Sequence, residues 1–152
     1  MDKEAVVKRL IIWLVSLFFL ASAGCGFHKK PEEQAQSFFG KGKHQIVKSL
    51  EQAEATPAQL DQARAVLERH EKTVVGNIGK LLEQQRLMII AITSGKNTSA
   101  LLALDQDLHK AHEQAVKSIG KMHEELEAAV GAKTWGLATA RMEEKVARYM
   151  KN

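Results

Sequence analysis

Residues 56–95 read TPAQLDQARAVLERHEKTVVGNIGKLLEQQRLMIIAITSG, and this stretch decides the fold. Thr56 can cap a helix, Pro57 fits a first turn, and Gln59 can reach back to complete a capping box. Gly95 can supply the left-handed residue that ends the helix. The stretch therefore predicts one helix of about 55 Å. One face of it carries a stripe with helical spacing: Leu60, Ala63, Leu67, His70, Val74, Ile78, Leu81, Gln85, Met88 and Ile92.

A second long helix is predicted immediately downstream. Residues 97–99, Asn-Thr-Ser, form a turn with its own cap, the helix covers about 100–130, and Gly131 ends it. Its stripe has the same spacing: Leu101, Leu104, Leu108, Ala111, Ala115, Ile119, Met122, Leu126 and Ala129. Two long helices joined by a short turn lie antiparallel. The predicted fold class is all-α, a long antiparallel helical hairpin with short flanking N- and C-terminal helices.

The flanking segments complete this prediction. A last helix covers about 134–150, with Trp135 and Met142 on its apolar side. On the N-terminal side, Gly40-Lys41-Gly42 predicts a break, so a helix is expected from His44 and the hairpin domain spans 43–152. Residues 25–42 are expected to form a flexible tether. Because the apolar stripes are narrow, one hairpin cannot shield itself fully, and a homodimer is favoured.

The first 24 residues have the pattern of an export signal. Basic residues precede an apolar run over 10–21, and Ser22-Ala23-Gly24 leads to Cys25, the single cysteine. The run is short for a membrane span, which needs about 20 apolar residues. Small residues directly before a cysteine resemble the lipobox of bacterial lipoproteins. An uncleaved anchor or a signal without lipid would also fit this pattern.

The lipobox resemblance implies cleavage before Cys25 and a diacylglycerol on its sulfur. The protein would then be held at the bacterial cell envelope by its acyl chains. Gly26, rather than Asp, follows the cysteine. By resemblance to lipoprotein sorting in Gram-negative bacteria, this favours the outer membrane, facing the periplasm.

Composition and the absence of certain motifs exclude several classes of function. Formal net charge is +4 with the charges interspersed, so no basic tract indicates nucleic-acid binding. The sequence has no Gly-rich phosphate loop, no His-Glu-x-x-His and no evident pairing of a nucleophile with a base. A binding protein is therefore expected rather than an enzyme.

The layout from 43 to 150 resembles the Spy/CpxP family of periplasmic stress chaperones and the related CnrX-type sensors and heavy-metal-resistance proteins. That family has a recurring Leu-Thr-x-x-Gln motif. The stretch Ala55-Thr56-Pro57-Ala58-Gln59 is similar to it, with Ala in place of Leu, and a second copy near Thr134 lacks the Gln. The resemblance implies a hooked all-α hairpin, usually dimeric, that acts as a holdase, a sensor partner or a metal binder.

Six histidines suggest metal binding as a possible function. His109 and His112 lie one helical turn apart, and Asp105 precedes His109 by four residues. His70 lies inside the apolar stripe, and a turn near 96–97 would place it opposite His123. Imidazole and carboxylate ligands suit Zn, Ni, Co or Cu. Exposed or core histidines without metal explain the same pattern.

The leading expectation is a lipid-anchored helical protein that binds unfolded or partner proteins on a concave surface. Leu87, Ile89 and Ile90 thicken the apolar stripe near the hairpin tip and are the candidate partner-binding residues, although core packing would explain them equally. Two further functions fit this chain: a CnrX-type metal-binding or metal-sensing protein, and a structural accessory subunit of an envelope complex.

Overall fold

A computed structural model describes residues 30–149, and for Tyr149 only the backbone. The described chain forms four helices and no strand: α2 (Pro31–Gln52), α3 (Pro57–Thr93), α4 (Thr98–Val130) and α5 (Ala132–Tyr149). The all-α prediction is confirmed. None of these helices is long and apolar enough to cross a membrane. The predicted signal over 1–24, Cys25 and the residues up to 29 lie outside the described residues.

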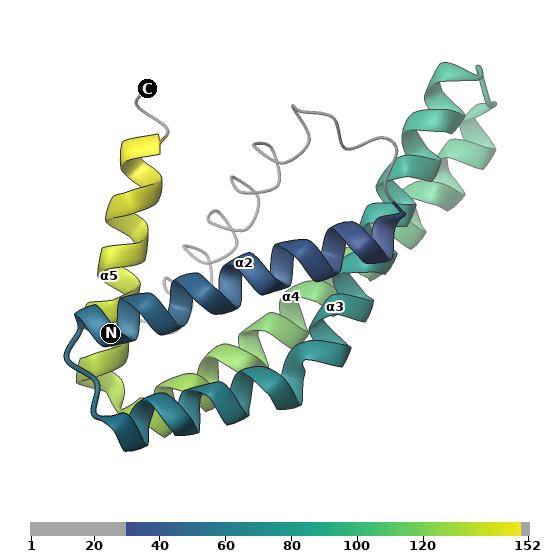
Figure 1. Cartoon of the computed structure of the whole chain (residues 1–152). Helices are drawn as coiled ribbons and strands as arrows, with labels where there is room; N and C mark the ends of the chain where they lie inside the picture. Colours follow the sequence, from purple (N-terminus) through teal and green to yellow (C-terminus); the bar gives the residue numbers. More distant parts are fainter. Residues whose placement is uncertain (1–29, 150–152) are drawn as a thin grey trace.

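Helices α3 and α4 lie side by side and run in opposite directions (Figure 1). Gln59, in the first turn of α3, donates to the carbonyl oxygen of Val130, the last residue of α4, at 2.6 Å. Further along, the Asn77 amide donates to the carbonyl oxygen of Gln114 at 3.3 Å. The pair has a base, where α3 begins and α4 ends, and a tip, where the turn over 94–97 joins them.

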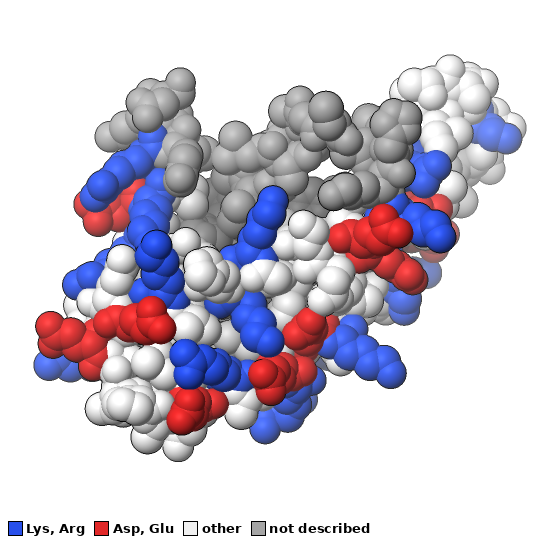
Figure 2. Space-filling model, in the orientation of Figure 1, with Lys and Arg blue, Asp and Glu red and all other residues white. Residues whose placement is uncertain are grey.

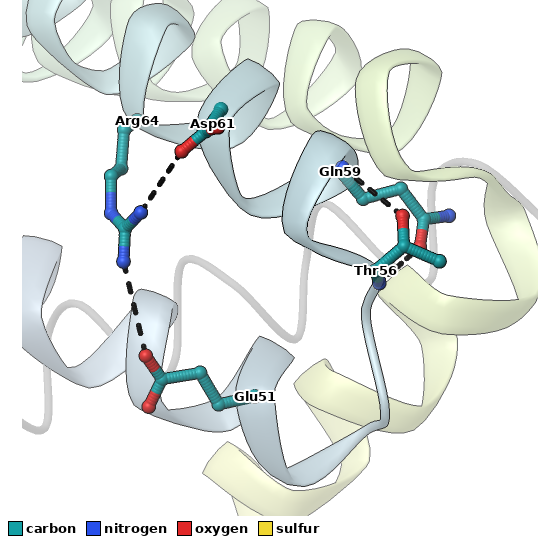
Figure 3. Close-up of polar contacts among 5 residues, drawn as sticks. All are labelled: Glu51, Thr56, Gln59, Asp61 and Arg64. Atoms are coloured by element: carbon teal, nitrogen blue, oxygen red, sulfur yellow. Dashed lines mark hydrogen bonds and ion pairs between the residues drawn. The ribbon is translucent and has the colours of Figure 1, made fainter.

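The ends of α3 and α4 are set by local capping. The predicted capping box is present, because Thr56 Oγ1 accepts from the Gln59 N–H at 3.3 Å and Gln59 Oε1 accepts from the Thr56 N–H at 2.8 Å (Figure 3). At the other end Gly95 has φ +69°, as a helix-ending glycine requires. Asn97 caps α4 through its side-chain oxygen, which accepts from the Ala100 N–H at 3.0 Å.

Helix α2 corrects two predictions. It begins at Pro31 and continues through Gly40 and Gly42, so the predicted break is wrong and residues 31–42 are not a tether. Ala35 and Phe39 are buried in the main core, where α2 packs against α3. Each glycine costs about 1 kcal/mol relative to Ala. Burial of a side chain such as Phe39 contributes about 1.5–3 kcal/mol, which offsets that cost.

Helix α5 closes the base of the molecule. It starts directly after Gly131, whose φ of +84° ends α4, and it packs against α2 and α4 (Figure 1). Trp135 is buried at its first turn. The helix starts at Ala132, two residues before the predicted start.

One main core holds these elements together at the base and middle of the molecule. It joins one side of every described helix, and its fully buried members include Leu50 of α2, Leu67 and Val74 of α3, and Leu126 of α4. A smaller cluster of Leu81, Ala111 and Ala115, with Leu108 against it, continues between α3 and α4 toward the tip. The tip extends beyond the helices that cover the base (Figure 1).

Candidate functional site: an apolar tip on the α3–α4 pair

The most unusual surface is the end of the α3–α4 pair, residues 87–104, which we name the apolar tip. Five of the six large apolar side chains found exposed among the described residues lie here: Leu87, Ile89, Ile90, Ile92 and Leu102. Ile90 is 49% exposed and Ile92 is 60% exposed. The same end of the molecule is mainly white in Figure 2, where charged residues are coloured. An exposed apolar patch of this kind is typical of an interaction surface.

Apolar side chains surround α3 at the tip rather than occupy one face. At about 100° per residue, Leu87, Ile89, Ile90 and Ile92 point to four different sides of the helix. Ala91 is buried and Met88 is half-buried, so the side of α3 that faces the core is also apolar. A helix that is apolar all round is normally surrounded on all sides by apolar material.

Charge is nearly absent from the apolar tip. Lys96 is the single charged residue between Leu87 and Leu104, and Arg86 and Asp105 bound this stretch. The predicted partner-binding residues Leu87, Ile89 and Ile90 are thus exposed, and they are not core. The prediction missed Ile92, which was assigned to the packed stripe, and Leu102. The nearly uncharged run across the turn was the signal that could have identified both.

His70 lies in the seam between α3 and α4, with Glu125 as its neighbour. Its ring is buried, and Nε2 lies 3.0 Å from Glu125 Oε2 without forming an aligned hydrogen bond. Arg69 Nη2 donates to the same oxygen at 2.9 Å. The contact with His70, and then the contact with Arg69, holds the pKa of Glu125 below its ordinary value. His70 therefore lies beside the Arg69–Glu125 ion pair that crosses the seam.

His123 contacts Trp135 of α5. The indole N–H of Trp135 points at the imidazole, with Nε1 3.1 Å from Nε2 and 3.3 Å from Nδ1, and the two rings meet edge to face at 74°. Burial lowers the pKa of His123 below 6.5, partly opposed by Glu127 and Glu124. His70 and His123 thus have different side-chain partners, and the expected metal site between them stays a prediction.

The remaining predicted metal ligands lie on the polar side of α4. Asp105 and His109 are exposed and His112 is half-buried. His109 Nε2 lies 3.7 Å from Glu113 Oε1, an exposed pair one turn apart. Within residues 30–149, no three His, Cys, Asp or Glu side chains are grouped so that they could hold a metal ion. A metal site at these histidines stays a prediction, and it would need a ligand from water or from a second copy.

Comparison with known proteins adds no relative. No protein-family model matches the chain, and neither a curated protein nor a solved structure matches it significantly.

Proposed function

We propose that this chain is a lipid-anchored periplasmic protein that acts by binding rather than by catalysis, in the manner of the Spy/CpxP family. In this proposal a diacylglycerol on Cys25 holds it at the envelope membrane. The apolar tip takes up apolar segments of unfolded or partner proteins. The observation that carries the proposal is the exposure of Leu87, Ile89 and Ile90 on a protruding end with almost no charge.

Exposed apolar side chains favour binding because their removal from water lowers the free energy. Each square ångström of apolar surface removed from water contributes about 25 cal/mol. An unfolded chain offers apolar segments of varied sequence, and a surface of Leu and Ile can bury them without directional hydrogen bonds. No catalytic group needs to be placed for such a role.

The test is an aggregation assay with a denatured client protein. The full anchored chain, in detergent micelles, is expected to delay aggregation, and an Ile89→Asp/Ile90→Asp variant is expected to lose most of that effect. The matched control is Leu137→Asp on α5, since Leu137 is 48% exposed and Ile90 is 49% exposed. Equal activity of the tip variant and the control would contradict the proposal.

A further inference from the structure

The first turn of α2 is the first described part of the chain after the predicted anchor, and it lies against α3 on the side of the apolar tip. Glu32 lies against α3 at Gly79, where a Cβ built on the glycine would be 3.6 Å from Glu32 Cγ. The chain therefore enters the body at the middle of α3, and the part of α3 after Gly79 extends beyond this entry point. In Figure 1 the start of α2 and the tip lie toward the same end of the molecule, and α5 lies at the other end.

The chain between Cys25 and α2 and the part of α3 beyond Gly79 have similar lengths. Six residue steps separate Cys25 from Pro31, which span at most about 20 Å when extended. Fourteen helical steps separate Gly79 from Thr93, the last residue of α3, and they span about 21 Å. A bilayer that holds the acyl chains of Cys25 is therefore within reach of the tip.

The chemistry of the tip favours lipid over a protein docking on one side. Leu87, Ile89, Ile90 and Ile92 surround α3, and Leu102 is exposed on α4. A docked protein covers one face of such a tip and leaves the others in water, whereas a bilayer covers all of them. Lys96, at the turn, has a long side chain that can keep its ammonium group among the headgroup phosphates. An interfacial apolar element of this kind inserts about 5–10 Å into the bilayer surface.

We infer that, in the anchored protein, the apolar tip is immersed in the surface of the bilayer that carries the Cys25 lipid. The membrane then has two contacts with the chain, the acyl chains and the tip. This inference rests on the lipid anchor of the proposed function and not on its client binding. Immersion would also regulate client binding, because a tip held in lipid must leave the bilayer before a polypeptide can bind to it.

A thiol-specific fluorescent probe can test this inference in the full, lipidated chain. A sulfur that carries diacylglycerol does not react with a maleimide, so a cysteine introduced elsewhere is the single labelling site. We would compare Ile90→Cys at the tip with the control Leu137→Cys, whose exposed fraction is nearly the same. Each labelled protein is reconstituted in vesicles of phosphatidylethanolamine and phosphatidylglycerol, with a nitroxide quencher on the lipid acyl chains.

The expected result is a blue-shifted probe at position 90 that the lipid-borne nitroxide quenches several-fold more strongly than the probe at 137. Equal, weak quenching at both positions would overturn the inference and leave client binding standing. A blue shift without quenching, together with crosslinking between two copies at position 90, would also overturn it and assign the tip to self-association. Labelling of the unsubstituted chain at Cys25 would show that the anchor itself is missing and would overturn the inference together with the anchor.

Discussion

At the scale of single residues, the contact between His123 and Trp135 joins α4 to α5 in one protonation state of the imidazole. Trp135 donates its indole N–H, and a neutral imidazole nitrogen can accept it. In the protonated ring both nitrogens are donors, so this hydrogen bond is lost. Burial already lowers the pKa of His123, and the environment thus favours the neutral form.

This contact predicts a loss of stability as the pH falls. The folded-state pKa of His123 lies below its unfolded value of 6.5, so between these values the unfolded chain binds more protons. The stabilisation is fully present above pH 6.5 and is lost as the pH falls from there toward the folded-state pKa. Urea unfolding between about pH 5 and pH 8 should show this loss.

The matched variant for that experiment is His123→Gln, which cannot titrate. The free energy of unfolding of the variant should depend less on pH over the same range. Curves of equal slope for the two proteins would contradict the prediction. Titration of Glu125 does not affect this comparison. Its pKa is lowered from 4.5, so its contribution to the free energy of unfolding is lost only as the pH falls below that value.

The partners of the histidines also lead to a prediction about metal ions. His70 is engaged with Glu125 and His123 with Trp135, so binding an ion between them would require both contacts to break. We expect Zn, Ni, Co and Cu to cause no rise in melting temperature that depends on His70 and His123. A metal that binds the folded state at a hundredfold excess over its Kd would add about 2.7 kcal/mol and would be readily detected. A rise that disappears in a His70→Ala/His123→Ala variant would restore the predicted metal site.

At the scale of helices, Gln59 has a second role besides the capping box. Its side-chain oxygen Oε1 accepts from the Thr56 N–H. Its side-chain nitrogen Nε2 donates to the Val130 carbonyl oxygen and so connects the start of α3 to the end of α4. Arg64 adds a contact between elements, since it lies 3.1 Å from Asp61 and 3.9 Å from Glu51 of α2 (Figure 3). These charges are exposed, and such pairs contribute little to stability.

A Gln59→Glu variant separates the two roles of this side chain. Glutamate can still accept from the Thr56 N–H, but it cannot donate to Val130, so the free energy of unfolding should fall by about 1–2 kcal/mol. Gln62→Glu is the control, because it adds the same charge to an exposed position near the same helix end. Urea denaturation measures both. Similar values for the two variants would show that the bond to Val130 contributes nothing.

The packing of α2 leads to a prediction that separates a helix from a tether. Phe39 is 5% exposed in the core, so Phe39→Ala should lower the free energy of unfolding by about 3–5 kcal/mol. In a flexible tether the same change would have almost no effect. Ser37→Ala, at an exposed position of α2, is the control and should change stability by less than about 0.5 kcal/mol. Calorimetric melting of both variants measures the difference.

At the scale of the whole molecule, the core and the candidate binding surface lie at different ends. The main core joins all the described helices at the base and middle, and the apolar tip extends beyond it. We therefore expect Ile90→Ser to leave the free energy of unfolding within about 0.5 kcal/mol of the original value. Circular dichroism during urea unfolding checks this, and a cost of several kcal/mol would show that the tip is part of the core.

Much of α3 and α4 could be predicted from the sequence because their ends and buried faces depend on neighbouring residues. Thr56 and Asn97 cap the two helices through bonds to residues three positions along the chain. Gly95 and Gly131 end them with positive φ. Helical spacing of apolar residues then assigns one buried side to each helix, as Leu67 and Leu126 show. These are short-range effects, and a single sequence contains them.

Tertiary structure decided the rest. Residues 31–42 are helical because Ala35 and Phe39 are buried against α3, which local propensity at Gly40 and Gly42 could not reveal. The sequence places His70 and His123 on facing helices, but packing between the helices gives them different partners. The sequence also contains the nearly uncharged run 87–104, whereas its exposure depends on α2 and α5 covering the base instead. Burial is a property of the assembled helices, so no local pattern could determine it.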